Sequence, residues 1–284
     1  MKERSFIHEF IAGNVGGIVG IGAVYPLDTI KIRIQTYPGL YKSSFDVLHQ
    51  MHQKSGVLSM YRGLLAPCAG FGLTFAISFS SFGYFSKCFK EYRNTSSNNT
   101  IDLIYAGALT GLVQSPPRAI MERIKSVMQV HEKKNNSTPF KWSGECFMYI
   151  LRHQGISGLF QGFSSVLLRE IPQFAVYYPT YYIAKDKFIN WGLSNTLSEL
   201  VAGGVAGVIQ WLPPLYNIDV IKSHMQTCEP GKYKGFVDCS RELYKTEGST
   251  VFFRGCQPAL VRAFCLHSII FYMYETTMRY LEAV

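Results

Sequence analysis

A charged motif occurs three times along this chain and limits the folds that the chain can adopt. Each copy has an acidic residue, a lysine three positions later and a glutamine four positions after the lysine. The three copies are Asp28, Lys31 and Gln35; Glu122, Lys125 and Gln129; and Asp219, Lys222 and Gln226. The acidic residues are 94 and 97 residues apart. A period of this length, present three times, indicates three copies of one structural unit.

The segments around the motif follow the same order in each copy. A long apolar segment ends in the motif, and a short amphipathic segment, a glycine-bounded connector and a second long apolar segment follow. The first copy predicts helices over residues 7–36, 44–54 and 64–92. The corresponding last helix covers 163–190 in the second copy and continues to about residue 281 in the third. The chain is therefore predicted to contain six long helices and three short ones.

Composition places these helices in a membrane. The chain is 48% hydrophobic and 17% charged, whereas soluble domains contain about 25% charged residues. Each long helix exceeds the roughly 20 residues that cross a hydrocarbon layer of about 30 Å. We expect an all-α membrane protein with six transmembrane helices in three pseudo-symmetric repeats around a central cavity. The repeats should cover residues 1–97, 98–192 and 193–284 and form one domain.

Several classes of function do not fit the sequence. The net charge of +9 comes from scattered basic residues, which argues against a nucleic-acid partner. The seven cysteines form no CxxC pair, which indicates free thiols rather than disulfides or a zinc site. No HExxH motif or nucleophile elbow is present, so we expect no catalytic residues, no metal, no cofactor and no enzyme activity. The first residues indicate neither a secretory signal nor an Arg-rich transit peptide.

The distribution of basic residues predicts an orientation. Loops within the repeats hold 12 Lys and Arg residues, against about seven in the N-terminus and the two linkers between repeats. Cytoplasmic or matrix loops of membrane proteins are enriched in Lys and Arg. The motif side should therefore face the matrix or the cytosol, with both termini on the opposite side.

Proline and glycine patterns around the motif carry a family resemblance. The first motif copy has Pro26 two residues before Asp28, and the third connector reads Glu247-Gly248 followed by Phe253-Arg254-Gly255. With these motifs the chain resembles the mitochondrial carrier family over nearly its whole length. Some positions depart from the family pattern, namely Ile120 and Asn217 in place of the motif proline, and Ser55-Gly56 and Gln154-Gly155 in the connectors. We expect nearby prolines to shift the helix kinks by a turn; they are Pro116, Pro117, Pro213 and Pro214.

The resemblance implies a location, partners and a mode of action. The chain would be a multi-pass solute carrier of the mitochondrial inner membrane that works as a monomer by alternating access, with its termini toward the intermembrane space. The three short helices would lie on the matrix side. A small molecule would be the substrate, and cardiolipin would bind at the matrix-side helix ends.

The resemblance also implies two gates. The motif charges would form a matrix gate in which each cation pairs with the next helix's acid, braced by Gln35, Gln129 and Gln226. Such pairs in a low dielectric are strong when made and costly when broken. The opposite gate is incomplete, because two of its three acids are missing. Its remaining members are Tyr181, Lys185, Tyr274, Glu275 and Arg279.

Alignment of the even-numbered helices by their connector glycines indicates a binding site. Gly70, Arg169 and Arg262 fall at equivalent depth and match the carriers' substrate contact points. A guanidinium in mid-membrane is costly unless it faces a polar interior, and its planar fork suits a carboxylate. The adjacent Glu170 would take an ammonium group. Thr74 and Tyr177 complete the predicted site.

The local sequence around the motifs is most similar to that of carnitine/acylcarnitine carriers and of basic amino-acid carriers of the ornithine type. The segment 168–172 is also similar to S-adenosylmethionine carriers. The second helix has no acid between Asp46 and Glu91 that could hold a side-chain ammonium. This absence favours a zwitterionic or quaternary cationic carboxylate such as carnitine. Transport of basic or other amino acids, or of S-adenosylmethionine, remains an alternative, as does a carrier-like membrane adaptor that does not transport.

Overall fold

The computed structural model describes residues 6–37, 40–41, 43–95, 99–130, 140–229 and 231–283. Within these ranges the secondary structure is helical and contains no strand. The elements are α1 (Phe6–Thr36), α2 (Ser44–Ser55), η1 (Val57–Tyr61), α3 (Leu65–Arg93), α4 (Thr100–Val130), α5 (Ser143–Leu159), α6 (Phe163–Asn190), α7 (Asn195–Ile209), α8 (Leu215–Thr227), α9 (Phe236–Glu247), η2 (Ser249–Phe253) and α10 (Cys256–Ala283). The predicted all-α architecture is confirmed.

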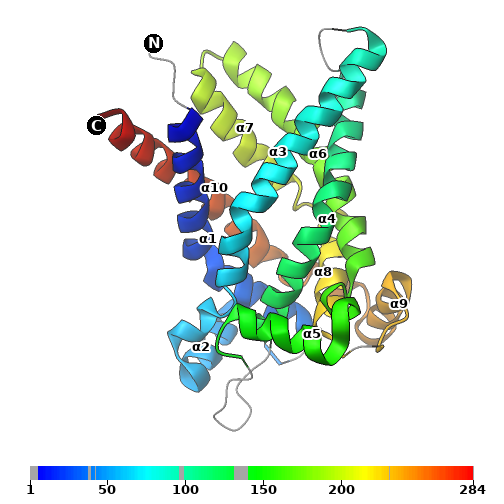
Figure 1. Ribbon diagram of the computed structural model, residues 1–284. Coiled ribbons are helices and arrows are strands. Elements are labelled where there is room, and N and C mark those ends of the chain that lie inside the picture. Colours follow the sequence, from blue (N-terminus) through cyan, green and yellow to red (C-terminus); the bar gives the residue numbers. More distant parts are fainter. Residues whose placement is uncertain are drawn as a thin grey trace.

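Long helices surround the centre of the molecule. The first helix, α1, packs against the last, α10, and against α3. Helix α3 then packs against α4, α4 against α6, α6 against α7, and α7 against α10. These contacts close the spans into a ring (Figure 1). The start of α1 and the end of α10 lie at one end of the ring, and α2, α5 and α9 lie at the other. The motif helices therefore end on the side of the short helices.

Within the described residues, three segments are long and apolar enough to cross a membrane by length and composition: Ile11–Thr36, Leu58–Arg93 and Ser249–Leu281. Helices α4 and α6 are comparably long, at 31 and 28 residues, and their charged residues include Arg118 and Glu122 of α4 and Arg169 and Glu170 of α6. Charged side chains within a span face the interior of a helical bundle rather than lipid. This distribution is consistent with α4 and α6 supplying much of a polar interior.

The fifth span differs from the other five because it is broken. Helix α7 ends at Ile209 and α8 begins at Leu215, with Pro213 and Pro214 between them. The sequence suggested only that these prolines would shift a kink by a turn. Proline removes a backbone donor and crowds the preceding turn, and here the helix stops. In the second repeat, Pro116 and Pro117 lie inside the continuous helix α4.

The three connectors share one backbone conformation in spite of their different sequences. Their first glycines, Gly56, Gly155 and Gly248, have φ values of 75°, 67° and 74°. Their second glycines, Gly63, Gly162 and Gly255, have φ values of 84°, 79° and 76°. Only glycine adopts positive φ at little cost. The glycines therefore set the shape of the connector, which explains how Ser55 and Gln154 can replace the usual acid.

Two of the connectors are tied to their motif helix by a tyrosine. The Tyr25 hydroxyl donates to the Arg62 carbonyl at 2.9 Å, and the Tyr216 hydroxyl donates to the Arg254 carbonyl at 2.6 Å. Each tyrosine stands three residues before a motif acid, where the second repeat has Ala119. The first and third repeats thus hold the end of the motif helix against the start of the following span.

Candidate functional site

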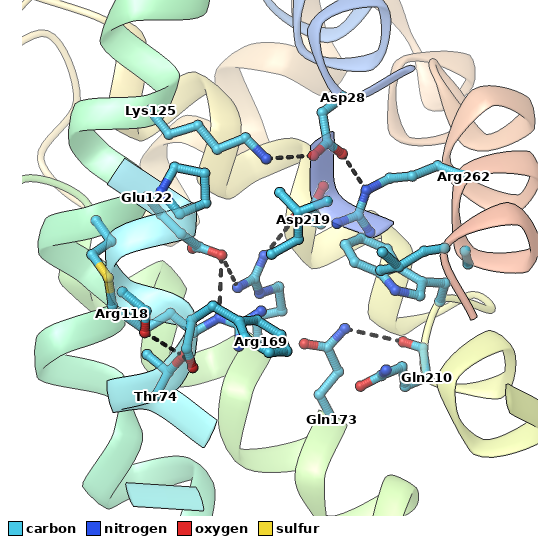
Figure 2. Close-up of a pocket in the computed structure, with 18 of the residues that line it drawn as sticks. Asp28, Thr74, Arg118, Glu122, Lys125, Arg169, Gln173, Gln210, Asp219 and Arg262 are labelled. Carbon is cyan, nitrogen blue, oxygen red and sulfur yellow. Dashed lines mark hydrogen bonds and ion pairs between the residues drawn. The ribbon is translucent and has the colours of Figure 1, made fainter. Parts of the chain in front are cut away.

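The six motif charges form a closed ring between the odd-numbered spans. Lys31 Nζ lies 2.5 Å from Asp219 Oδ2, Lys125 Nζ 2.5 Å from Asp28 Oδ2, and Lys222 Nζ 2.9 Å from Glu122 Oε2. Each lysine meets the acid of the preceding repeat, with the third repeat preceding the first. The sequence predicted that each lysine would pair with the acid of the next repeat. The structure shows the reverse order. The ring joins all three repeats, and Figure 2 shows Asp28, Glu122, Lys125 and Asp219 among its members.

The three motif glutamines differ in their contacts. The Gln35 amide donates to the Tyr216 hydroxyl at 2.9 Å and to Asp219 Oδ2 at 3.4 Å, so it touches a ring carboxylate. The Gln129 amide donates to Thr29 Oγ1 at 3.1 Å, next to Asp28 in the chain. Gln226 is fully buried, and neither atom of its amide has a hydrogen-bond partner among the described residues. Only Gln35 has the geometry of the predicted brace.

Arg169 of α6 extends the ring. Its Nη1 donates to Asp219 Oδ1 at 2.8 Å, its Nη2 to Glu122 Oε1 at 2.6 Å, and its Nε to Glu170 Oε1 at 3.1 Å. The residue is only 2% exposed. Arg169 therefore connects acids from two of the lysine pairs, and in this conformation its guanidinium is used within the protein.

Arg262 of α10 also contacts the ring, through an ion pair between its Nε and Asp28 Oδ1. Its guanidinium carbon lies 5.6 Å from the centre of the Trp211 ring, and Lys31 Nζ lies 4.3 Å from the same ring. A cation over an indole face is attracted by the electron density of the ring. The indole face of Trp211 is therefore engaged by two cations of the protein in this conformation.

Arg118 of α4 lies at the same site, and sequence reasoning did not select it. Its Nε is 3.3 Å from both Glu122 Oε1 and Glu170 Oε1. Its side chain is 33% exposed, against 16% for Arg262 and 2% for Arg169. Arg118 stands four residues before Glu122, so the two share one face of α4. That spacing from a motif acid was the signal that could have identified it.

A cavity of about 340 Å³ lies beside the ring. Its volume is near the lower end of the range for small-molecule sites, roughly 300–1,000 Å³. Aromatic residues form part of its wall. Phe71, Phe75 and Phe79 follow one another along α3, with ring centres 5.6 and 4.4 Å apart, and Tyr177 of α6 also lines the cavity. The cavity thus combines a charged end with an aromatic wall.

The predicted binding residues occupy different positions around this cavity. Gly70, Thr74, Tyr177, Arg169 and Arg262 line it. A side chain at Gly70 would lie 1.6 Å from Met121 Sδ, because that methionine already fills the space above the glycine. The Thr74 hydroxyl donates to the Gly70 carbonyl at 2.9 Å.

Glu170, the expected ammonium ligand, is fully buried and does not line the cavity. A Cβ at Gly111 of α4 would lie 2.5 Å from the Glu170 backbone oxygen, so the two helices approach closely at this point. The Glu170 carboxylate meets Arg118 and Arg169, and its Oε2 has no partner among the described residues. The carboxylate is therefore behind the two arginines as seen from the cavity.

Cations outnumber acids in the ring and the groups that contact it. The cations are Lys31, Lys125, Lys222, Arg118, Arg169 and Arg262, and the acids are Asp28, Glu122, Glu170 and Asp219. With every group in its usual ionisation state, six positive charges face four negative ones, an excess of two. Each of the four acids contacts at least two of these cations.

At the end of the helical ring far from the motif charges, the described ion pairs do not form a closed network. Lys185 Nζ pairs with Glu199 Oε1 of α7 at 2.6 Å, not with an even-numbered span. Among the described side chains, no ion pair at this end joins two even-numbered spans. The side chain of Glu275 lies outside the described part of the structure, and Tyr274 and Arg279 share α10 with it. Tyr181 stacks on Tyr177 with ring centres 6.3 Å apart.

The short helices on the motif side bury two thiols. Cys146 of α5 and Cys239 of α9 are both fully buried, and burial raises the pKa of each thiol to about 12. A thiol with such a pKa stays protonated and unreactive at neutral pH. These two cysteines are free, and they therefore behave as small apolar packing residues.

Comparisons with known proteins match the whole chain. The family model described as mitochondrial carrier protein matches residues 2–93, 96–191 and 193–283. The chain is similar to the mitochondrial arginine transporter BAC2 of Arabidopsis thaliana, with 35% identity over 97% of this chain and 92% of that protein. It is also similar to the human mitochondrial carnitine/acylcarnitine carrier protein, with 32% identity over 99% and 96% of the two chains.

A third relative is the mitochondrial basic amino acids transporter of Rattus norvegicus, 31% identical over 96% of this chain and 90% of that protein. These relatives are transporters of small molecules and not enzymes, and they differ in the substrates that their names give. The three matched segments agree with the threefold repeat of charged motifs and with the helical ring. This chain belongs to the mitochondrial carrier family.

Proposed function

We propose that this carrier moves a small zwitterionic carboxylate, with carnitine and acylcarnitine as the leading candidates, across the mitochondrial inner membrane by alternating access. The motif ring acts as the matrix gate, and the chain termini face the intermembrane space. The excess of basic residues in the loops on the motif side supports this orientation. Substrate binds in the cavity between Arg169, Arg262, Tyr177, Thr74 and Gly70, with Glu170 as a buried counter-charge.

The charge of the cavity is the observation that carries the choice of substrate. Its surplus of two cations attracts a carboxylate and repels a substrate of net positive charge. Every acid in the site already contacts at least two protein cations, so a primary ammonium would have to compete for them. A quaternary ammonium donates no hydrogen bond and is attracted to aromatic faces. Tyr177, Phe75 and Phe79 supply such faces on the wall.

The same contacts indicate how a substrate opens the matrix gate. A carboxylate that binds Arg169 competes with Asp219 and Glu122, which hold that guanidinium in the closed ring. Competition for Arg262 releases Asp28 in the same way. Buried ion pairs that lose one partner are strongly destabilised. Substrate binding therefore weakens two of the lysine pairs through the arginines that they share.

A basic amino-acid carrier is the second candidate. The 35% identity to the Arabidopsis arginine transporter over 97% of this chain favours it. The buried, unpartnered Glu170 Oε2 also offers an acceptor for an ammonium group. An S-adenosylmethionine carrier falls in the same class, because that substrate also carries a net positive charge with a carboxylate.

The proposal includes a monomer with an anionic lipid such as cardiolipin at the matrix-side helix ends. A pocket of about 250 Å³ lies at the start of α6, lined by Gly162, Ser164 and Lys234 among others. The first amide groups of a helix have no intrahelical acceptor and attract anions. A phosphate group in this pocket would meet those amides and a lysine.

Exchange in liposomes tests the proposal. Purified protein is reconstituted into vesicles loaded with carnitine, and uptake of labelled carnitine, acetylcarnitine, arginine, ornithine, S-adenosylmethionine and ADP is compared. We expect uptake of carnitine and its acyl esters to exceed that of the cationic amino acids. Faster uptake of arginine or ornithine would support the second candidate instead. No uptake, combined with no thermal stabilisation by any solute, would favour a non-transporting adaptor.

A further inference from the structure

We propose that Arg118 of α4 is the first anchor for the substrate's carboxylate and determines the preference for carboxylate-bearing substrates. This inference rests on the proposed function, because it assigns a specificity residue to the same cavity. Arg118 lies on an odd-numbered span and is therefore not among the three positions that alignment of the even-numbered spans selects.

Exposure distinguishes Arg118 from the other two arginines of the cavity, because its side chain is 33% exposed against 16% for Arg262 and 2% for Arg169. Arg169 uses all three of its guanidinium nitrogens on Asp219, Glu122 and Glu170. In Arg118, the only guanidinium nitrogen that contacts described residues is Nε, which meets Glu122 and Glu170. Its two Nη atoms donate no hydrogen bond within the described part of the chain. Two free nitrogens on a planar guanidinium match the two oxygens of a carboxylate.

Crowding of positive charge gives the anchor its strength. Arg118 and Arg169 contact the same two atoms, Glu122 Oε1 and Glu170 Oε1, and Glu122 also pairs with Lys222. All three cations thus contact Glu122 within a set of six cations and four acids, and like charges held together favour a further anion. In the close-up, Arg118 and Arg262 come from opposite sides of the cavity with Arg169 between them (Figure 2). Arg118 is the most exposed member of this set, and its two Nη atoms are not used by the ring.

The position of Arg118 on α4 connects the anchor to the ring. Arg118 and Glu122 are one helical turn apart, and Glu122 is the acid of a lysine pair. A substrate carboxylate on Arg118 therefore meets the ring before it can reach Arg169, which is nearly inaccessible in this conformation. Binding begins at Arg118, and Arg169 is released when the ring opens.

The test compares substrates that differ by a carboxylate. The variants are Arg118→Gln and Arg118→Lys, with Arg152→Gln as a control that removes one exposed positive charge from α5. Each variant is reconstituted in liposomes, and KM and kcat are measured for the pairs carnitine and choline, and arginine and agmatine. The second member of each pair lacks the carboxylate. Thermal melting of every variant reports whether it is folded.

We expect Arg118→Gln to raise KM for carnitine roughly tenfold or more, the usual worth of a hydrogen bond to a charged group. Choline uptake should change much less, Arg118→Lys should fall between, and Arg152→Gln should match the wild type. An Arg118→Gln variant whose KM stays within twofold of the wild type would overturn the inference, as would an equal effect on carnitine and choline.

Failure of the proposed function gives a different result. A wild type that moves arginine in place of carnitine disproves that function, and Arg118 is then tested by the arginine and agmatine pair. Arg118→Gln should raise KM for arginine and spare agmatine if the anchor is correct. A wild type that moves none of the four solutes would overturn both proposals.

Discussion

The two ends of the helical ring are held by different forces. At the motif end, three lysine pairs, Arg169 and Arg262 form one buried network across all three repeats. At the other end, the Lys185–Glu199 pair joins neighbouring spans, and its side chains are 25% and 48% exposed. Buried pairs in low dielectric interact far more strongly than exposed pairs, which water and salt screen. Among the described side chains, a charge network that joins all three repeats is therefore present at the motif end, whereas the ion pairs at the other end, Lys185–Glu199 and Arg93–Asp102, each join two neighbouring spans.

Aromatic contacts take the place of charge at the far end. Phe82 of α3 stacks on Tyr178 of α6 with ring centres 3.6 Å apart, and the Tyr178 hydroxyl hydrogen-bonds with Ser78 Oγ at 3.0 Å. Stacked pairs contribute about 0.5–1.5 kcal/mol beyond their buried area. The loss of two gate acids from the sequence thus has a structural counterpart. The opposite gate, at the far end, depends on the stacking of aromatic side chains. Its closure should therefore respond little to salt.

The largest effect is expected from Arg169→Ala. The change removes the one side chain that contacts three acids, and leaves Asp219, Glu122 and Glu170 with less compensation. We expect transport to be lost and the unfolding free energy to fall by about 3–5 kcal/mol, as when a buried pair is broken. Liposome uptake and thermal melting measure the two effects. Folded protein with unchanged uptake would exclude Arg169 from both site and gate.

The second largest effect is expected for the coupling within one ring pair, which a double-mutant cycle measures. Asp28→Ala, Lys125→Ala and the double variant isolate the coupling between two ring side chains that are 2.5 Å apart. We expect a coupling of roughly 1–3 kcal/mol, in the range for contacting residues of one network. Chemical unfolding in detergent gives the four free energies. Additive single effects would mean that Arg262, the other partner of Asp28, carries the interaction.

The fold followed from the sequence because its determinants are local and repeat three times. The bounds of α1, α3 and α6 agree with the predicted ranges 7–36, 64–92 and 163–190. The lengths of the apolar segments, the spacing of the motifs and the connector glycines can all be identified from the sequence. The break between α7 and α8 was less accessible, since Pro116–Pro117 and Pro213–Pro214 look alike in sequence but only the second pair interrupts its helix.

The site was predicted only in part, because its details depend on which side chains meet across the ring. Motif periodicity identified the six lysine and acid residues, whose pairing needs only the threefold arrangement. Arg118 has no counterpart in the other repeats, where Val24 and Leu215 stand, so repetition could not point to it. The space at Gly70 is filled by Met121, a contact between helices that no spacing along one helix reveals.

A smaller effect separates two glutamines that the sequence treats alike. Gln35→Ala removes donors to Tyr216 and Asp219 and should lower the unfolding free energy by about 1–2 kcal/mol. Gln226→Met replaces a buried amide without a described partner by an apolar side chain of similar size. That change should be neutral or stabilising. Thermal melting of both variants decides the matter, and equal losses would mean that Gln226 braces the ring as Gln35 does.

The smallest effect belongs to the exposed pair at the far end. A double-mutant cycle on Lys185→Ala and Glu199→Ala should give a coupling of about 0.2–1 kcal/mol, because both partners are partly exposed. The coupling should shrink further in high salt, since solvent-exposed charges are screened there. The same salt increase should leave the Asp28–Lys125 coupling nearly unchanged, since those side chains are 7% and 19% exposed. A Lys185–Glu199 coupling as large and as salt-resistant as the Asp28–Lys125 coupling would show that charge holds both ends. The difference between the two ends, from which we inferred that the far end depends on Phe82 and Tyr178, would then disappear.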